Sequence, residues 1–290
     1  MANLKDIKRR IGSVKNTQKI THAMKLVSAA KFARANQAVV GARPYGKAFE
    51  EMVGRVVAVA GENAATPLTT PRGQFKKTLM VLVSTDRGLC GGLNSNLFKY
   101  ANKFVKEQAS KGQTVEVIAW GRRAISFAKK MKWTVLFERE KVTDKPRYDG
   151  AKSLAKDVVN SFLSGNFDTV QVVFVEFKSA MTQIPSSKQL LPIDPTSKVG
   201  NANDSAEDII LEPAATEFLA SLIRKQVEGS IFRVLLEATA SEHGARMTAM
   251  DSATKNAKEV TRKLTLQYNR GRQAAITREL IEITSGAEAL

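Results

Sequence analysis

The sequence predicts a mixed α/β fold. A smaller domain built on a parallel sheet is inserted in the chain between two long terminal helices. Three observations carry this prediction. Apolar residues recur at helical spacing from residue 3 to about residue 58. Short apolar runs alternate with helix-like stretches between residues 75 and 180. The chain has no proline from Ala214 to Ser285 and keeps apolar residues at helical intervals there.

The amino-terminal helix, within a segment 1–60, begins with a coiled-coil seam. Its apolar residues are spaced three, four and three apart, at Leu4, Ile7, Ile11 and Val14. Polar residues then stand where the seam would continue, at Gln18 and Thr21. We therefore expect the buried stripe to shift here, onto Ile20, Met24 and Val27.

Residues 41–48, GARPYGKA, match the nucleotide-binding P-loop motif G-x-x-x-x-G-K-[ST] at every position except the last, which lacks the hydroxyl group. Ala48 stands where the magnesium-binding Ser or Thr belongs, and Pro44 has no backbone N–H to offer a phosphate. A P-loop also follows a strand, whereas a helix-forming sequence precedes this one. We interpret the segment as a bend or irregular turn in the long helix.

The central segment, 75–200, is expected to form the α/β domain. Four apolar runs are predicted strands: TLMVLVS (78–84), VEVIAW (115–120), WTVLFE (133–138) and TVQVVFVEF (169–177). Helix-like stretches separate them, which is typical of a parallel sheet with crossover helices. QIPSSKQLLPI and EDIILEP extend the domain, with a polar loop, SKVGNANDSAED, between them.

The carboxy-terminal segment, 210–290, is predicted to be one helix of about 70 residues, on the order of 100 Å long. Its middle is lined with Ala, Ser, Thr and Gly, which let another helix approach closely. A helix this long exceeds the width of a small domain, so other surfaces must bury it. We expect the two terminal helices to pack on each other and on foreign protein.

Composition restricts the class of protein. The formal net charge is +17, and residues 1–60 alone hold 12 Lys and Arg against 3 Asp and Glu, so an anionic partner is expected. No apolar run is long enough to span a membrane, and the start lacks the apolar core of a signal peptide. The single cysteine, Cys90, excludes an internal disulfide and is read as a buried, inert thiol.

The segment STDRGLCGGLN (84–94) lies where a doubly wound fold places its phosphate loop, but its glycines do not fit the fingerprint. We expect a tight turn instead, with Asp86 and Arg87 projecting from an exposed loop to touch a partner. His22 and His243 each stand alone on a long helix. The sequence therefore predicts no catalytic residue, no metal site and no cofactor.

Three segments together resemble the gamma subunit of F-type ATP synthases, over the whole length and in the right order. They are KRRIGSVKNTQKITHAMKLVSAAKF near the start, STDRGLCGGLN in the middle and NRGRQAAITRELIEITSGAEAL at the end. The family's closing pattern, Arg-Gln followed by I-T-x-E-L-x-E-I, is matched by Arg272, Gln273 and residues 276–283.

This resemblance implies a long antiparallel coiled coil of the two terminal helices with an inserted Rossmann-like α/β domain. It implies a non-catalytic rotor whose partners are the alpha, beta and epsilon subunits and the membrane ring of c subunits. It places the chain at the cytoplasmic face of the bacterial inner membrane, peripheral and not inserted. Residues implied to engage the beta subunit are Met24, Lys25, Arg272, Gln273 and Thr277.

Two other classes of protein remain as alternatives on the residues alone. A basic nucleic-acid-binding protein would use the charged amino-terminal helix, although few aromatic residues are available to stack on bases. A nucleotide-binding α/β enzyme would use one of the two glycine-containing segments. Salt-dependent DNA binding and ATP affinity, respectively, would distinguish them from a rotor subunit.

Overall fold

The computed structural model describes residues 4–60, 65–70, 76–141, 146–193 and 215–288. The chain falls into two compact units. One contains Met1–Ala29 with Arg246–Leu290, and the other contains Ala30–Ala245. Two long helices, α1 (Leu4–Ala60) and α5 (Ala215–Glu288), contribute to both units. The expected segments SKVGNANDSAED and EDIILEP lie outside the described residues, and the domain boundaries 1–60, 75–200 and 210–290 stay a prediction.

The larger unit contains a five-stranded sheet of order β3-β2-β1-β4-β5. The strands are β1 (Lys77–Val83), β2 (Thr114–Trp120), β3 (Val135–Arg139), β4 (Thr169–Phe177) and β5 (Gln183–Leu191). The first four are mutually parallel, as predicted, and β5 pairs antiparallel with β4. The order and direction are those of a Rossmann-like sheet with one antiparallel edge strand.

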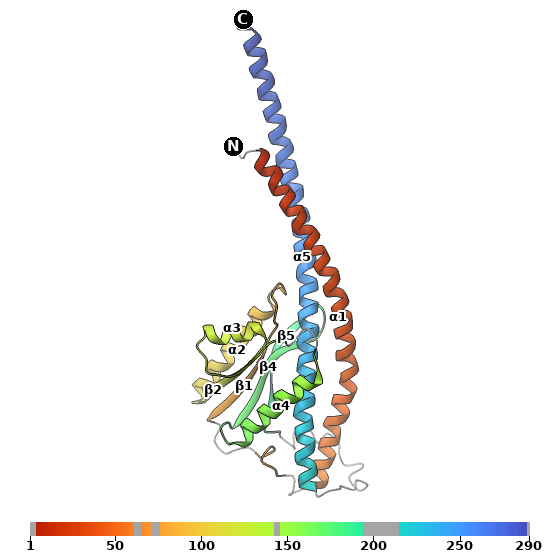
Figure 1. The fold of residues 1–290 in the computed structure, drawn as a ribbon, viewed down its shortest axis with the longest axis vertical. Helices are drawn as coiled ribbons and strands as arrows, with labels where there is room; N and C mark the ends of the chain where they lie inside the picture. The colour runs from red at the N-terminus through yellow and green to blue at the C-terminus, as the bar shows by residue number, and fades with distance from the viewer. Residues whose placement is uncertain (1–3, 61–64, 71–75, 142–145, 194–214, 289–290) are drawn as a thin grey trace. The chain divides into compact units, whose positions relative to one another are not determined.

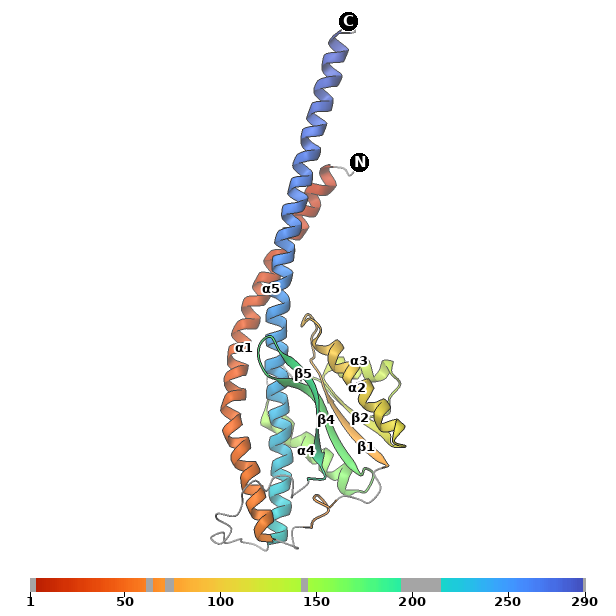
Figure 2. The same ribbon diagram turned by 180° about the vertical axis from the view of Figure 1, so that it is seen from behind.

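Helices cover both faces of this sheet, because its inner strands are apolar on both sides. Met80 and Leu82 of β1 pack with α2 (Leu93–Ser110) and α3 (Arg122–Lys130). The alternate residues Leu79, Val81 and Val83 face α4 (Tyr148–Leu163) on the other side. Figures 1 and 2 show these helices on opposite faces, so the unit has three layers.

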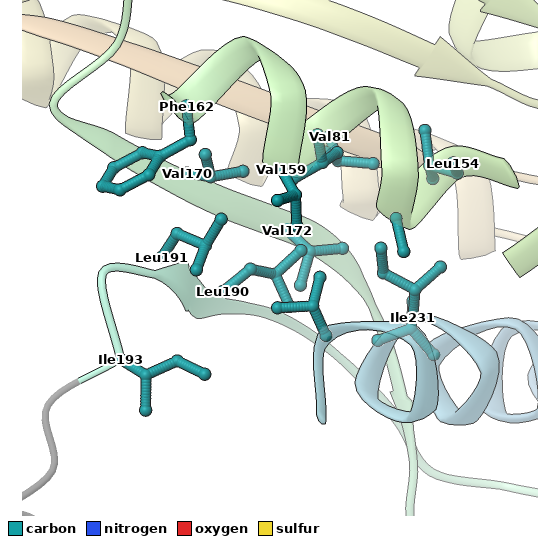
Figure 3. Packing of buried hydrophobic residues seen from close by; sticks show 14 of the residues in the cluster. Val81, Leu154, Val159, Phe162, Val170, Val172, Leu190, Leu191, Ile193 and Ile231 are labelled. Atoms are coloured by element: carbon teal, nitrogen blue, oxygen red, sulfur yellow. The ribbon is translucent and has the colours of Figure 1, made fainter. Parts of the chain in front are cut away.

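The long helices extend the core on the α4 face. Val159 and Phe162 of α4 pack over Val170 and Val172 of β4, with Leu190 and Leu191 of β5 beside them (Figure 3). Ile231 of α5 completes this cluster, and α1 adds Val53, Val56 and Val57. The buried α5 residues recur at helical spacing, from Leu219 through Ile223 and Val227 to Ile231. This apolar stripe fixes which face of α5 meets the sheet.

Residues 41–48 are helical throughout, so the segment belongs to the long helix as expected, but the irregular turn given as one form of that interpretation is wrong. Pro44 lies inside α1 with the helix assigned on both sides of it. Its ring removes one backbone N–H from the helical ladder. The apolar contacts of Val39 and of Val53 hold the helix in place before and after that residue.

The smaller unit pairs the start of α1 with the second half of α5 in antiparallel order. Leu4 lies against Gly271, the Thr21 hydroxyl lies 2.8 Å from that of Thr254, and Lys25 reaches Asp251. Residues later in α1 therefore pair with residues earlier in α5. The predicted antiparallel helix pair is confirmed for this unit.

The expected shift of the buried stripe onto Ile20, Met24 and Val27 is wrong for the two aliphatic residues. Ile20 and Val27 are 60% and 58% exposed, whereas Thr21 and Ser28 are buried. The original seam spacing therefore continues, with polar residues in its buried positions. Small hydroxyl side chains fit there because the facing helix offers hydrogen-bonding groups of its own, such as Thr254.

Candidate partner-binding surfaces

Lys25, one of the expected partner contacts, is held by the opposite helix in the smaller unit. Its Nζ lies 2.6 Å from Oδ1 of Asp251, while Lys255 approaches Oδ2 of the same carboxylate at 2.8 Å. Hydrogen bonds from Lys25 and then Lys255 lower the pKa of Asp251 to about 2. The Lys25 side chain is about one-third exposed, so it joins the two helices while part of it still faces solvent.

Met24 stands beside Lys25 and is half-buried in the helix pair, with Ile20 and Val27 exposed one turn to either side. These three apolar residues share one side of α1 at spacings of three and four. A half-buried Met with exposed aliphatic neighbours offers an adaptable apolar contact. The surface around Met24 and Lys25 thus combines apolar and positively charged side chains.

Near the carboxyl end of α5, Arg272, Gln273 and Thr277 lie on the helix surface and are exposed. The Thr277 hydroxyl donates to the backbone oxygen of Gln273 at 3.0 Å. Because α1 is described only from Leu4, which meets Gly271, no second helix of the described chain faces the residues beyond. The apolar residues of that segment are accordingly exposed: Ile276, Leu280, Ile281 and Ile283.

The loop after β1 organises the carboxyl edge of the sheet. Asp86 does not project from an exposed loop as expected, since its side chain is only 8% exposed. Its Oδ1 accepts the backbone N–H groups of Arg122 at 3.1 Å and Lys141 at 3.0 Å, which follow β2 and β3. The carboxylate therefore ties three successive loops together. Arg87 is exposed beside it.

A short polar network supports the same loop. The Thr85 hydroxyl lies 2.6 Å from the backbone oxygen of Arg87 and receives a hydrogen bond of 2.8 Å from the Asn94 amide. Cys90 is buried, as expected, and accepts a hydrogen bond from the same amide at 3.4 Å. Leu89 takes a left-handed φ of 61° and is exposed. The turn is thus held from inside while Arg87 and Leu89 face solvent.

In doubly wound folds a ligand binds at the carboxyl ends of the strands where the order reverses, here β1 and β4. In this chain α5 occupies that place. Ser241 donates to the backbone oxygen of Val175 at 3.4 Å, and Oε2 of Glu237 accepts from the backbone N–H of Phe177 at the same distance. Ala245 packs in the cluster that contains Cys90 and Leu93. The crevice that would take a nucleotide is filled by the chain's own helix.

The sequence reasoning missed Asp251, the residue that positions Lys25. The signal was present, because Asp251 is an isolated carboxylate among small residues in a segment expected to allow close helix approach. Within the described ranges, no helix is long and apolar enough to cross a membrane. The same residues contain no group of three His, Cys, Asp or Glu side chains placed to hold a metal ion.

The fold defines a class of α/β protein with two long terminal helices, which pair antiparallel in one unit, and a Rossmann-like sheet in the other unit. The chain belongs to the ATP synthase family, whose profile matches residues 3–290. It is 46% identical over 292 residues to the ATP synthase gamma chain of Trichlorobacter lovleyi, covering 100% of this chain and 99% of that one. The gamma chain of Anaeromyxobacter sp. (strain Fw109-5) is 42% identical and is covered completely.

Solved structures give the same fold. A chain in the OSCP/F1/c-ring structure of Euglena gracilis mitochondrial ATP synthase matches with a TM-score of 0.68 and 21% identity, covering 99% of this chain and 94% of that one. A chain in the central stalk/c-ring structure of Tetrahymena thermophila mitochondrial ATP synthase matches with a TM-score of 0.62 and 21% identity, covering 81% of this chain and 99% of the other.

Proposed function

We propose that the chain is the rotating central-stalk subunit of an F-type ATP synthase. Its partners are the alpha and beta subunits around the helix pair, and the epsilon subunit and the membrane c ring at the α/β domain. The observation that supports this proposal is the full-length similarity to bacterial ATP synthase gamma chains, at 46% identity to that of Trichlorobacter lovleyi. Nothing in the comparisons supports the nucleic-acid-binding alternative.

In this role the segments 1–60 and 210–290 form the shaft, and 75–200 forms the foot. Proton flow turns the ring and the foot with it, and the uneven shaft drives the beta sites through different affinities for ADP and ATP. The chain itself is not catalytic and carries no cofactor. Its place is the cytoplasmic face of the bacterial inner membrane, where it is held by its partners and does not insert.

Three surfaces are proposed to meet the surrounding subunits. Met24 offers an apolar contact, and Lys25 a positively charged contact, to acidic loops of beta. Coulomb attraction of this kind depends little on the rotational angle of the shaft. Arg272, Gln273 and Thr277 meet a loop of one beta subunit at a time, because they lie on one side of one helix. Arg87 makes the contact from the β1 loop, which Asp86 holds in place.

Assembly tests the proposal. The chain is co-expressed with the alpha and beta subunits of a bacterial relative such as Trichlorobacter lovleyi, and the complex is purified through a tag on beta. We expect the chain to co-purify and to be required for steady ATP hydrolysis, and a bead attached to its β1 loop to rotate during turnover. Failure to co-purify, together with salt-sensitive DNA binding by the free chain, would favour the nucleic-acid-binding alternative.

A further inference from the structure

A groove of about 460 Å³ lies between α4 and α5, within the larger unit. Charged and amide side chains line it: Asp149, Lys152, Lys156 and Asn160 of α4, and Arg224 and Glu228 of α5. None of the residues named above as contacts with other subunits belongs to this lining. The groove is therefore a separate feature of the chain, and its chemistry is considered on its own.

The apolar core holds the two helices in place beneath the groove. Ala155 and Val159 of α4 form part of its lining and are buried. Both belong to the hydrophobic cluster that contains Ile223 and Val227 of α5. The polar side chains of the groove thus extend from two packed helices and not from loops, which is the kind of support that a precise binding site needs.

Three cations of the lining form no ion pair with a described residue: Lys152, Lys156 and Arg224. All three are exposed, and the nearby carboxylate Asp157 is paired with Arg139 instead. Lys152 and Lys156 lie four apart on one face of α4, an arrangement of like charges that destabilises a helix. Like charges gathered in a concave site raise its positive potential, so an anion is attracted there.

The two carboxylates among the described lining residues do not cancel this charge. Glu228 accepts hydrogen bonds from Tyr148 at 2.7 Å and from Lys225 at 3.0 Å, and Lys225 lies outside the lining. The charge of Glu228 is therefore offset by a cation that the groove does not use. Asp149 lies seven residues before Lys156, which is about 10 Å along the helix axis.

The carboxylates are confined to one end of the groove. Tyr148, at the start of α4, contacts both Glu228 and Phe232 of α5. Residues later in α4 and earlier in α5 line the remainder, namely Lys156, Asn160 and Arg224. That end carries two cations and an amide, and no carboxylate of the described lining belongs to it.

We propose that the end of the groove formed by Lys156, Asn160 and Arg224 binds a phosphate group. The Arg224 guanidinium offers a planar fork that matches two phosphate oxygens, and Lys156 supplies a point charge. The Asn160 amide donates to a further oxygen, while Lys152 adds attraction from one turn away. Free phosphate and a phosphomonoester, such as a lipid headgroup, both present this dianionic group.

Equilibrium dialysis of the purified full-length chain against radiolabelled inorganic phosphate, at low ionic strength, tests the site. We expect saturable binding of one phosphate per chain, weakened by added NaCl because the cations are exposed. Glycerol 3-phosphate as a competitor distinguishes the two sources of the group. If it displaces phosphate at concentrations below those of unlabelled phosphate, the ligand is a phosphomonoester, and if it needs higher concentrations, the ligand is free phosphate.

The lining is tested by substitution. Arg224→Gln and Lys156→Gln should each weaken phosphate binding about tenfold, the size of one charge-assisted hydrogen bond. Asp149→Asn removes a repulsive charge from the same groove and should tighten binding about twofold to fivefold. Arg262→Gln is the matched control, because Arg262 is also exposed on α5 but does not line the groove. Its affinity for phosphate should equal that of the wild type.

Three results would overturn the proposal: no saturable binding up to millimolar phosphate, wild-type affinity in both Arg224→Gln and Lys156→Gln, or equal losses in Arg224→Gln and Arg262→Gln. The last would mean that phosphate responds only to the net charge of +17. Circular dichroism checks that each variant is folded, and Lys156→Gln serves if Arg224→Gln is not. Since the free chain is used, these results do not depend on assembly with other subunits.

Discussion

Nζ of Lys25 and Oδ1 of Asp251 lie 2.6 Å apart, although 226 positions separate the two residues in the sequence. This ion pair joins the start of α1 to the second half of α5, and the Thr21 and Thr254 hydroxyls meet about one turn away. Lys255 binds the other oxygen of the same carboxylate. Asp251 is therefore the carboxylate that links the two helices at the level of the proposed beta contact.

The Asp251 link predicts an acid-sensitive helix pair. The pKa of Asp251 in the folded chain, about 2, is lower than its ordinary value of 3.8, so the carboxylate stabilises the folded state above about pH 4. This contribution is lost as the pH falls from about 4 to 2. In urea unfolding, the wild type should lose more stability over this interval than Asp251→Asn does.

Glu259→Gln is the control for this experiment. Lys263 lowers the pKa of Glu259, but the two residues lie four apart on the same helix, so their pair joins no second element. Because the pKa of Glu259 is lowered as well, Glu259→Gln should also lose less stability than the wild type over this interval, but by a smaller margin than Asp251→Asn. If Asp251→Asn and Glu259→Gln behave alike, the carboxylate of Asp251 does not link the helices in solution.

The second prediction concerns the loops tied by Asp86. Asp86→Ala leaves the partly buried N–H groups of Arg122 and Lys141 without their acceptor, which should cost roughly 1–3 kcal/mol of stability. Asp86→Asn keeps an acceptor oxygen at that position and should restore most of the loss. Amide hydrogen exchange at residues 122 and 141 is the direct measurement, and unchanged protection of both in Asp86→Ala would contradict this role.

The elements of the fold could be predicted from the sequence because each has a strong local pattern. The apolar run 169–177 became β4 with the same bounds, since continuous β-branched and aromatic residues suit a strand buried on both faces. The absence of proline after Ala214 foretold α5 in the same way. The antiparallel direction of β5 was not predicted, because pairing direction depends on the connection as well as on the strand.

The errors arose where tertiary contacts outweigh local pattern. Gln18 and Thr21 predict an end of the seam because buried positions are usually apolar, yet Thr21 finds a hydroxyl partner on α5. The position of Asp86 in a loop predicts exposure because charged loop residues are usually exposed, whereas its carboxylate is buried against backbone donors of residues 122 and 141. No pattern within a single segment contains such partners. The roles proposed for Met24, Lys25 and Thr277 stay predictions.

A third prediction concerns Gly121, which precedes α3 with a φ of 104°. A Cβ there would lie 2.3 Å from the backbone oxygen of Ser84, which real Cβ atoms do not tolerate. Gly121→Ala should therefore destabilise the chain by more than about 2 kcal/mol, through backbone strain and a clash that cannot relax cheaply. Gly112→Ala isolates the strain alone, because Gly112 has a φ of 75° with no atom near its Cβ. Equal losses in the two variants, measured by urea unfolding, would show that the contact with Ser84 adds nothing.

The last prediction concerns Arg272 and Gln273, which are exposed on α5 beyond the residues that α1 faces. Arg offers a planar fork of five donors and Gln both a donor and an acceptor, so together they can hold a carboxylate and a neighbouring backbone group of a beta loop. Loss of such charge-assisted bonds should cost about 1.5–3 kcal/mol in the one beta conformation that makes them. In the assembled complex, Arg272→Ala with Gln273→Ala should lower ATP synthesis and steady hydrolysis several-fold.

Assembly of this double variant should persist, because the apolar residues Ile276, Leu280 and Ile283 are unchanged and remain free to pack against the surrounding subunits. Arg278→Ala is the matched control: it removes the same charge from an exposed position of the same helix, on the side away from Arg272, Gln273 and Thr277. Turnover should therefore fall in the double variant and stay near the parental value in Arg278→Ala. If the double variant assembles and matches the parent in turnover and torque, then Arg272 and Gln273 only solvate the helix, and the contact with beta must come from other residues of α5.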